Sequence, residues 1–231
     1  MEKLSYQETN KKFWDDHFSK VSLDYPNEEV VRFLARCRKL YEDAVMLDWG
    51  CATGRHTVLG CKFGYSVIAA DYVERCVDIT KRKVERECKD SKGKVISYIV
   101  NQDIDIEEIN DNTLDIIVAL GVVFLNAKEQ QQLMINNMYR MLKKGGRVFA
   151  DFRTERDSLF INQKEKSEQG FYVDSEDASI AGNYIDIIPL DELKKMFINS
   201  GFTLENIELY EFTEHNQARQ NSWWHVTLLK E

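Results

Sequence analysis

The chain has 231 residues, 43% of them hydrophobic and 30% charged, with a formal net charge of −8 at pH 7, which is ordinary for one globular domain with its own core. The acidic balance lacks the basic face that nucleic-acid phosphates require, so we expect no nucleic-acid partner. No apolar run reaches membrane-spanning length, the first residues lack the apolar core of a signal peptide, and the five cysteines show no C-x-x-C spacing, so we expect no membrane partner and a cytoplasmic location with reduced thiols.

Residues 1–40 are expected to form a helical cap ahead of the first strand. Aromatic and acidic residues gather in the stretch FWDDHF at residues 13–18, which fits a helix that packs its rings on the domain. A second helix is predicted over Glu28–Tyr41, because its apolar residues recur at helical spacing.

A glycine-rich turn follows the first predicted strand. Three apolar residues lead into Asp48. The turn then runs through Gly50, Ala52 and Gly54, and a helical pattern follows. Glycine lets the backbone turn sharply and admits a ligand close to the main chain. A strand, such a turn and a helix in succession predict a nucleotide-binding site.

The second predicted strand, residues 64–71, ends in Asp71. A carboxylate at this place can accept hydrogen bonds from both ribose hydroxyls of a nucleotide. Dinucleotide folds use G-x-G-x-x-G, whereas the turn here has a different glycine spacing and Asp48 would repel a pyrophosphate. An NAD-dependent oxidoreductase is therefore less favoured than a protein whose nucleotide carries cationic groups.

Strands and helices alternate over the rest of residues 41–153, which predicts a parallel sheet. The further elements are predicted, in chain order, as a helix over 74–89, strands over 94–100 and 114–121, a helix over 128–142 and a strand over 147–153. Gly145 and Gly146 are expected to end the last of these helices. Because open α/β sheets bind ligands at the carboxyl ends of their strands, Leu120 and Gly121 are expected to lie along the ligand.

Periodicity lapses from residue 154 to residue 188, and a segment this long between elements is usually functional or mobile. Residues 190–200 then predict a short helix. Residues 202–212 and 222–229 predict an antiparallel pair of strands joined by a polar loop.

This pattern resembles the class I S-adenosylmethionine-dependent methyltransferases, whose first motif is an acidic residue followed by a G-x-G-x-G turn. Asp48, Gly50, Ala52 and Gly54 fall on that motif, with Ala52 in place of the middle glycine. Asp71 falls on the family's ribose-binding acid. The run Leu-Lys-Lys-Gly-Gly-Arg before the last core strand is also common in the family. The resemblance covers the core well and the C-terminal part loosely.

The resemblance implies a Rossmann-like, three-layer α/β sandwich with a seven-stranded, mostly parallel sheet and an antiparallel C-terminal hairpin, in a single domain over residues 1–231. It implies S-adenosyl-L-methionine as the cofactor. It divides the chain after the helical cap into a cofactor-binding core over 41–153, a substrate lid over 154–188, and a C-terminal helix and hairpin over 189–231.

Further cofactor contacts follow from the resemblance. Trp14 is a candidate lid residue, since an aromatic face suits a sulfonium, and Tyr72 follows the ribose-binding acid. In the family, an acid soon after the third strand binds the adenine amino group, and a neighbouring apolar side chain packs on the ring. Asp103 and Ile104 match these two in kind and place, with Asp105 as a competitor for the acid.

Candidates for a general base are His56, His215 and His225, although a lone histidine is more often structural. Arg153 and Tyr184 are candidates for binding the acceptor, Arg153 because a guanidinium can hold a carboxylate or a phosphate. Transfer to the methyl carbon mainly requires an acceptor held close, in line and dry. No cluster has metal-ligand spacing, so we expect no metal.

The expected acceptor is a small polar metabolite methylated on oxygen or nitrogen, with sugars and phosphorylated intermediates among the candidates. Nucleobase methylation is disfavoured, because the chain lacks both the polar-Pro-Pro-aromatic motif of amino-methylating DNA enzymes and the Pro-Cys of cytosine enzymes. The alternative from another class is a catalytically silent S-adenosylmethionine-binding regulatory or scaffold protein. The sequence leaves the oligomeric state open.

Overall fold

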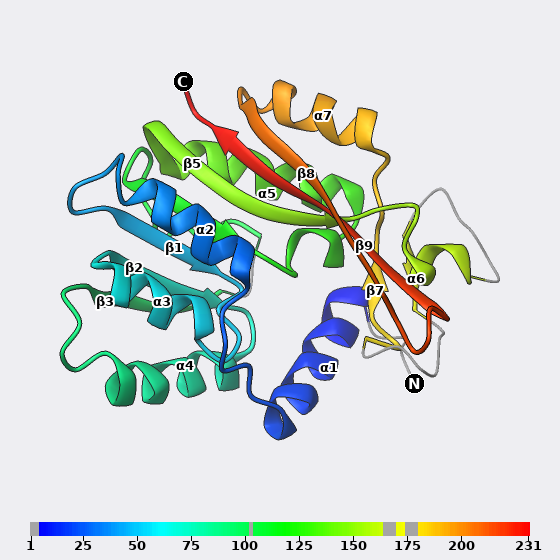
Figure 1. Ribbon diagram of the computed structural model, residues 1–231, viewed down its shortest axis with the longest axis horizontal. Coiled ribbons are helices and arrows are strands. Elements are labelled where there is room, and N and C mark those ends of the chain that lie inside the picture. Colours follow the sequence, from blue (N-terminus) through cyan, green and yellow to red (C-terminus); the bar gives the residue numbers. More distant parts are fainter. Residues whose placement is uncertain (1–4, 102–103, 164–169, 174–179) are drawn as a thin grey trace.

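The structure is a computed structural model that describes residues 5–101, 104–163, 170–173 and 180–231. A seven-stranded sheet forms its centre, in the order β3-β2-β1-β4-β5-β9-β8 (Figure 1). Its strands are β1 (Val45–Trp49), β2 (Ser66–Asp71), β3 (Lys94–Val100), β4 (Leu114–Ala119), β5 (Leu142–Arg153), β8 (Thr203–Glu214) and β9 (Arg219–Leu229). Neighbours are parallel from β3 to β5, and β9 and β8 are added antiparallel. The predicted fold class is confirmed.

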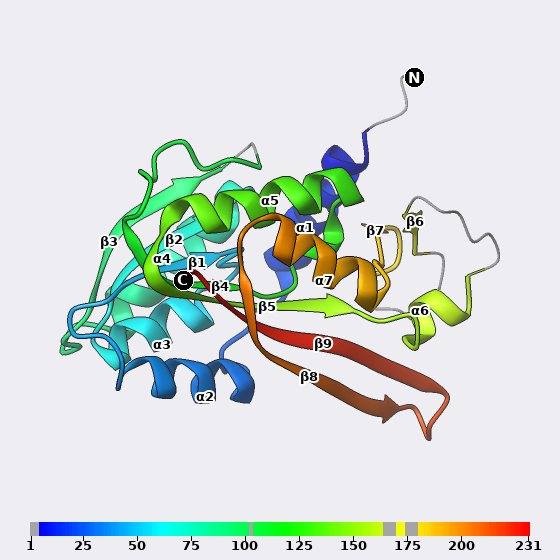
Figure 2. The same ribbon diagram turned by 90° about the horizontal axis from the view of Figure 1, so that it is seen from above.

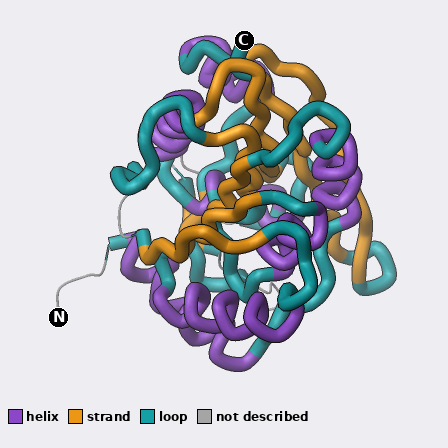
Figure 3. The backbone as a smooth tube through the Cα atoms, turned by 90° about the vertical axis from the view of Figure 1, so that its left-hand side faces the viewer, coloured by secondary structure: helices purple, strands orange, loops and turns teal. Residues whose placement is uncertain are grey.

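Helices cover both faces of the sheet and make three layers (Figures 2 and 3). One face carries α2 (Glu28–Cys37), α3 (Arg55–Phe63) and α4 (Glu74–Glu87), and the other carries α5 (Lys128–Met141) and α7 (Leu190–Asn199). In β1, Leu47 packs toward α5 and α7, whereas Met46 packs toward α2 and α3. Successive side chains of a strand point to opposite faces, so a strand buried on both faces is apolar along most of its length.

The N-terminal helix α1 (Tyr6–Lys20) contacts α4 and the short strand β7 (Tyr184–Ile185). A capping box at Ser5 begins the helix. The Asn10 side chain fixes α1 to β7, because it donates to the carbonyl oxygen of Tyr184 at 3.0 Å and accepts the Tyr184 N–H at 2.7 Å. These two bonds hold α1 beside the carboxyl ends of the parallel strands (Figure 1).

The glycine pair Gly145-Gly146 does not end the preceding helix, so this prediction was wrong. Helix α5 ends at Met141, and extended chain begins at Leu142. The backbone leaves the helix at this point because Leu142 already pairs with Leu114 of β4. The glycines lie inside β5, where the pairing with β4 shifts register and Gly145 donates its N–H to the carbonyl oxygen of Lys230.

Short elements occupy the chain between β5 and α7. They are α6 (Ser158–Ile161) and β6 (Phe171–Tyr172), which pairs with β7. Leu159 and Ile185 pack in one apolar cluster with the 3-10 turn η1 (Val123–Leu125), which follows β4. This segment therefore lies beside the carboxyl ends of β4 and β5. Its role as a substrate lid stays a prediction, as do the boundaries of the four parts of the domain.

Candidate active site

The turn between β1 and α3 requires glycine at two places. Gly50 has φ of +80°, and a Cβ there would lie 2.2 Å from Cγ2 of Val122. Gly54 has φ of +85°, and a Cβ there would lie 3.0 Å from the Thr80 side chain. An L side chain is strained at such φ values, whereas glycine is not. The backbone can therefore pass between Val122 and Thr80 only because both positions lack a side chain.

Asp71 presents a buried carboxylate beside this turn. It ends β2 and is 6% exposed. One carboxylate oxygen accepts the Ala52 N–H and the other accepts the Val73 N–H, both at 2.9 Å. Burial raises the pKa of Asp71 to about 6, and the backbone N–H groups act in the opposite direction. The carboxylate keeps lone-pair capacity with which it can accept a ligand hydroxyl.

A cavity of about 270 Å³, the first cavity, opens at the carboxyl ends of β1, β2 and β4. Most of the residues predicted to bind the cofactor line it: Trp14, Gly50, Ala52, Asp71, Tyr72, Ile104 and Leu120. The Trp14 indole N–H is buried and has no hydrogen-bond partner within the described ranges. Burial raises the pKa of Tyr72, so its phenol stays protonated. The predicted residue Asp103 lies outside the described residues.

Asp48 does not belong to the wall of the first cavity, contrary to the prediction that it contacts the ligand. It is 1% exposed, and its carboxylate accepts the Thr57 hydroxyl at 2.6 Å. Burial raises the pKa of Asp48 to about 6. Its carboxylate is directed to α3, behind the turn. Gly54 also lies off the wall, packed against Thr80. Both residues therefore support the turn on the side that faces away from the first cavity.

A second cavity, of about 460 Å³, adjoins the first. The wall that they share is formed by Trp14, Arg55, Leu120, Gly121 and Leu125. The remaining walls of the second cavity carry charged and aromatic side chains: Phe124, Asp151, Arg153, Tyr210, Phe212, Trp223 and His225. These shared residues place the two cavities next to each other.

Arg153 lines the second cavity as predicted for an acceptor-binding residue, but its charge is already paired. Its Nη1 donates to the carboxylate of Asp157 at 2.5 Å, and both side chains are buried. The guanidinium carbon lies 4.7 Å from the centre of the Trp223 ring. Burial lowers the pKa of Arg153, and Asp157 opposes this change. The guanidinium is therefore held by protein groups on two sides.

The three candidate histidines lie in different places. His56 lines the first cavity, and its Nε2 lies 3.2 Å from the Asn27 side-chain oxygen. Burial lowers the pKa of His56 to about 3, so the imidazole is neutral near pH 7. His225 lines the second cavity, opposite Asp151 in the β5–β9 register. His215 lies in the exposed turn between β8 and β9, off both cavities, so its candidacy as a base is corrected.

Tyr184 also lies off both cavities, which corrects its prediction as an acceptor-binding residue. Its ring packs on Tyr6 of α1, with centroids 4.5 Å apart, and on Tyr172 of β6. Tyr6, rather than Tyr184, reaches the first cavity. The N-terminal helix thus stands between Tyr184 and the site.

Sequence reasoning missed two charged residues on these walls, Arg55 and Asp151. Arg55 begins α3 directly after the glycine turn and lines both cavities. Asp151 lines the second cavity, accepts the Gly121 N–H at 2.7 Å and has a pKa raised by burial. An acid near the carboxyl end of a buried strand was the signal that identified Asp71. The same signal is present at Asp151.

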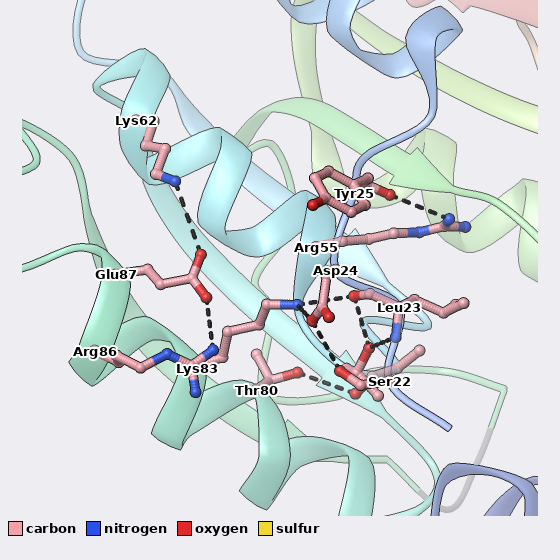
Figure 4. Close-up of polar contacts among 12 residues, drawn as sticks. Ser22, Leu23, Asp24, Tyr25, Arg55, Lys62, Thr80, Lys83, Arg86 and Glu87 are labelled. Atoms are coloured by element: carbon pink, nitrogen blue, oxygen red, sulfur yellow. Dashed lines mark hydrogen bonds and ion pairs between the residues drawn. The ribbon is translucent and has the colours of Figure 1, made fainter. Parts of the chain in front are cut away.

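The connection between α1 and α2 is tied to the glycine turn and to α4 (Figure 4). Lys83 of α4 is 4% exposed, and its ammonium donates to the Leu23 carbonyl oxygen and to the Asp24 carboxylate, both at 2.8 Å. The Thr53 hydroxyl accepts the Leu23 N–H at 2.8 Å and donates to the Leu23 carbonyl at 3.0 Å. Helix α1 is thus anchored at both ends, by this connection and by Asn10.

A methyltransferase-domain family matches residues 46–146, from β1 into the glycine pair of β5. This match makes residues 46–146 similar to methyltransferase domains, and it spans less than half of the chain. Solved structures agree with this fold. An N-methyltransferase from Bradyrhizobium japonicum, in complex with S-adenosylhomocysteine, has a TM-score of 0.66 at 14% identity, covering 96% of this chain and 98% of that one. Magnesium protoporphyrin IX methyltransferase from Synechocystis, with bound S-adenosylmethionine, has a TM-score of 0.67 at 13% identity, covering 100% of both chains. The predicted resemblance to the methyltransferases is confirmed, and the predicted enzyme class and cofactor agree with these relatives.

Curated relatives of this methyltransferase domain overturn the expectation that nucleic acids are excluded as partners. A tRNA N(3)-methylcytidine methyltransferase of Schizosaccharomyces pombe is 22% identical over 74% of this chain and 59% of its own length. A tRNA(Thr) (cytosine(32)-N(3))-methyltransferase of Saccharomyces cerevisiae is 22% identical over 89% of this chain and 34% of its own length. The chain thus spans about a third to three fifths of these relatives. The net charge is summed over the whole surface, whereas a nucleic acid contacts only one patch of it. A net charge of −8 therefore does not exclude a nucleic-acid partner.

Two further observations concern the described ranges alone. No group of three or more His, Cys, Asp and Glu side chains in them is placed to hold a metal ion. None of the helices in them combines the length and the apolar character needed to cross a bilayer.

Proposed function

We propose that this chain is an S-adenosylmethionine-dependent methyltransferase that methylates an oxygen or nitrogen of a small polar metabolite. The observation that carries the proposal is the pair of adjoining cavities, whose shared wall includes Trp14, Leu120 and Gly121. Gly50 and Ala52 of the family motif line the first cavity together with Asp71, and the second cavity has room for a small acceptor. Ligands bound in the two cavities would lie next to each other at the residues that line both, which is the arrangement that direct transfer requires.

The first cavity fits the chemical parts of the cofactor. The Asp71 carboxylate offers acceptors to the ribose hydroxyls, and Ile104 offers an apolar face to the adenine ring. Arg55 and the unpartnered indole N–H of Trp14 offer donors to the carboxylate of the methionine part. Bound S-adenosylmethionine supplies an electrophilic methyl group on a sulfonium. Asp48, through Thr57, holds the turn in the shape that this ligand requires.

The protein's own part in the transfer is to exclude water and to orient the acceptor. Leu120, Leu125 and Trp14 give the shared wall an apolar character, and positioning alone can supply roughly 7 kcal/mol or more of the barrier. A hydroxyl acceptor also needs a base near its proton. Asp151 and His225 both line the second cavity and could take that proton, whereas an amine needs only to be neutral.

A phosphorylated acceptor is less favoured than the other polar metabolites. The basis for expecting one was the Arg153 guanidinium, which already donates to the buried Asp157. An acceptor phosphate would therefore compete with a carboxylate that is itself held by the N–H groups of Leu159 and Ser222, both at 2.9 Å.

A tRNA nucleoside is the second candidate acceptor. Both curated relatives are tRNA methyltransferases, which favours it. The second cavity also has aromatic walls, among them Phe124 and Trp223, on which a base turned out of its stack could lie.

The experiment that tests both candidates incubates the purified chain with methyl-labelled S-adenosylmethionine, in one arm with a metabolite extract and in the other with total tRNA. The proposal predicts label in acid-soluble small molecules, which mass spectrometry then names. Label in tRNA alone would replace it with the second candidate. Cofactor binding by calorimetry without transfer in either arm would instead support the silent binding protein. Asp71→Ala is the control that lowers cofactor binding.

A further inference from the structure

Asp151 lies beside the wall that the two cavities share. It stands near the carboxyl end of β5, is 8% exposed and lines the second cavity. One of its carboxylate oxygens accepts the N–H of Gly121, a residue that lines both cavities, at 2.7 Å. This bond fixes the carboxylate, whose second oxygen keeps the capacity to accept a hydrogen bond from a ligand.

Among the residues that line the second cavity, Asp151 is the carboxylate available to an acceptor, and His225 lies opposite it. Arg153 lies two residues further along β5, on the same face, but it is paired with Asp157. Arg55 is placed by the proposed function on the cofactor's carboxylate. Among the described residues, Asp151 takes part in no ion pair within 4.0 Å. An anionic acceptor would therefore meet a buried carboxylate of like charge.

The outer part of the second cavity is aromatic. Tyr210 and Phe212 of β8 and Trp223 of β9 line it, and Phe212 stacks on Trp223 with ring centroids 5.6 Å apart. Tyr210 and Phe212 are 41% and 39% exposed, so they form its rim. Aromatic faces carry negative electrostatic potential and attract cations as well as flat rings. The cavity thus combines an aromatic rim with a carboxylate beside the cofactor chamber.

We propose that the acceptor atom is the nitrogen of a small amine, held at Asp151 while the rest of the molecule lies against Tyr210, Phe212 and Trp223. The reaction is then N-methylation of a compound that enters as an ammonium ion. This inference rests on the proposed function and narrows its acceptor from oxygen or nitrogen to an amine.

The transfer balances with Asp151, solvent and the family's methyl donor. The ammonium first loses one proton, which Asp151 accepts and passes to solvent. The nitrogen lone pair then forms the bond to the methyl carbon, and the carbon–sulfur bond breaks with both electrons left on sulfur. The product is the methylated ammonium, and one proton has been released in total.

The test measures binding rather than turnover, with two matched probe pairs: tryptamine against indole-3-propionate, and phenethylamine against 3-phenylpropionate. Each is titrated calorimetrically into the full chain saturated with S-adenosylhomocysteine. In the wild-type protein each amine should bind at least tenfold more tightly than its matched carboxylate. Asp151→Asn, which keeps an oxygen for the Gly121 N–H, should reduce that ratio below threefold, and Asp151→Glu should restore part of it.

Asp78→Asn is the matched control, because it removes one acid from the exposed side of α4, away from both cavities, and should leave the ratio unchanged. Equal or tighter binding of the carboxylates to the wild-type protein, or no binding of either amine up to 10 mM, would overturn the inference. So would an unchanged ratio in folded Asp151→Asn. Failure to bind S-adenosylhomocysteine would instead overturn the proposed function, so the two failures are distinct.

Discussion

The two cavities differ in how the chain builds them. The first takes Arg55, His56, Asp71 and Tyr72 from two short stretches, residues 49–56 and 71–72, which are each contiguous in sequence. The second collects side chains from distant elements, such as Trp14 of α1, Arg153 of β5 and Trp223 of β9. Binding of a widely used ligand can be encoded in a local turn. Recognition of a particular acceptor depends on which distant elements the fold brings together.

The largest effect is expected at the turn itself. Gly50→Ala places a Cβ 2.2 Å from Val122 at a φ of +80°, so it should lower the free energy of unfolding by about 2–4 kcal/mol and abolish cofactor binding. Gly145→Ala has a similar φ, +84°, but nothing within 4 Å of the added Cβ. It should cost only about 1–2 kcal/mol and leave cofactor binding intact. Chemical denaturation and calorimetry distinguish the two, and equal effects would mean that crowding at the turn is irrelevant.

Asp71→Ala is expected to weaken ligand binding in the first cavity. Losing hydrogen bonds from the ribose hydroxyls to a charged group should weaken S-adenosylhomocysteine binding by roughly 1–3 kcal/mol. Asp78→Ala removes an exposed acid of α4 and should leave the affinity within twofold. Calorimetry on both variants measures this difference. An unchanged affinity in Asp71→Ala would remove the ribose assignment.

The buried carboxylates predict a pH dependence of stability without cofactor. Asp48 and Asp71 have pKa values of about 6 in the folded protein, against roughly 4 in an unfolded chain. Between these values the folded state keeps protons that the unfolded state releases. Their contribution to the free energy of unfolding therefore falls as pH rises from about 4 to about 6.

Asp48→Asn keeps an acceptor for Thr57 and removes one of these two contributions. It should raise the free energy of unfolding at pH 7 by on the order of 1–3 kcal/mol relative to wild type. Urea unfolding at pH 4, 5, 6 and 7 provides the measurement. If the free energies of unfolding of the two proteins change in parallel with pH across this range, Asp48 does not contribute to the pH dependence.

A smaller effect is expected at the tie between α4 and the connection that follows α1. Lys83→Met removes donors to Leu23 and Asp24 and should lower the free energy of unfolding by about 1–2 kcal/mol. Hydrogen exchange of residues 21–27 should also become faster. Lys81→Met, on the exposed side of α4, is the control. Unchanged exchange in Lys83→Met would show that the connection is held by other contacts.

The smallest effect is expected at His215, in the exposed hairpin turn. His215→Ala should change cofactor affinity and transfer rate less than twofold and stability by less than about 0.5 kcal/mol. His225→Ala, which opens a gap in the wall of the second cavity, should reduce transfer while leaving cofactor affinity within twofold. A large loss of transfer in His215→Ala would show that the hairpin turn reaches the acceptor.

The contrast between the cavities also explains which parts of the site could be predicted. Gly50 and Asp71 were readable because a turn and a strand end are local patterns. The orientation of Asp48 could not be predicted, since the sequence does not tell whether its carboxylate contacts a ligand or the Thr57 hydroxyl of α3. Tyr184 was misplaced because the contact that decides its position comes from Asn10 and Tyr6, far away in sequence.

The acceptor side depended on pairings that the chain order does not reveal. Arg153 appeared free, yet the turn into α6 brings Asp157 onto it four residues later. Asp151 and His225 face each other only because β9 inserts between β5 and β8. The fold itself was predictable, since the alternation of apolar strands and amphipathic helices is repeated along the chain and tolerates errors at single boundaries such as Leu142.

The most direct test of the central claim is a crystal structure of the full chain with S-adenosylhomocysteine. We expect the ribose hydroxyls within hydrogen-bonding distance of Asp71, the amino-acid carboxylate at Arg55, and the sulfur facing the second cavity past Gly121. A ligand seated in the second cavity, or one whose ribose makes no contact with Asp71, would contradict the account.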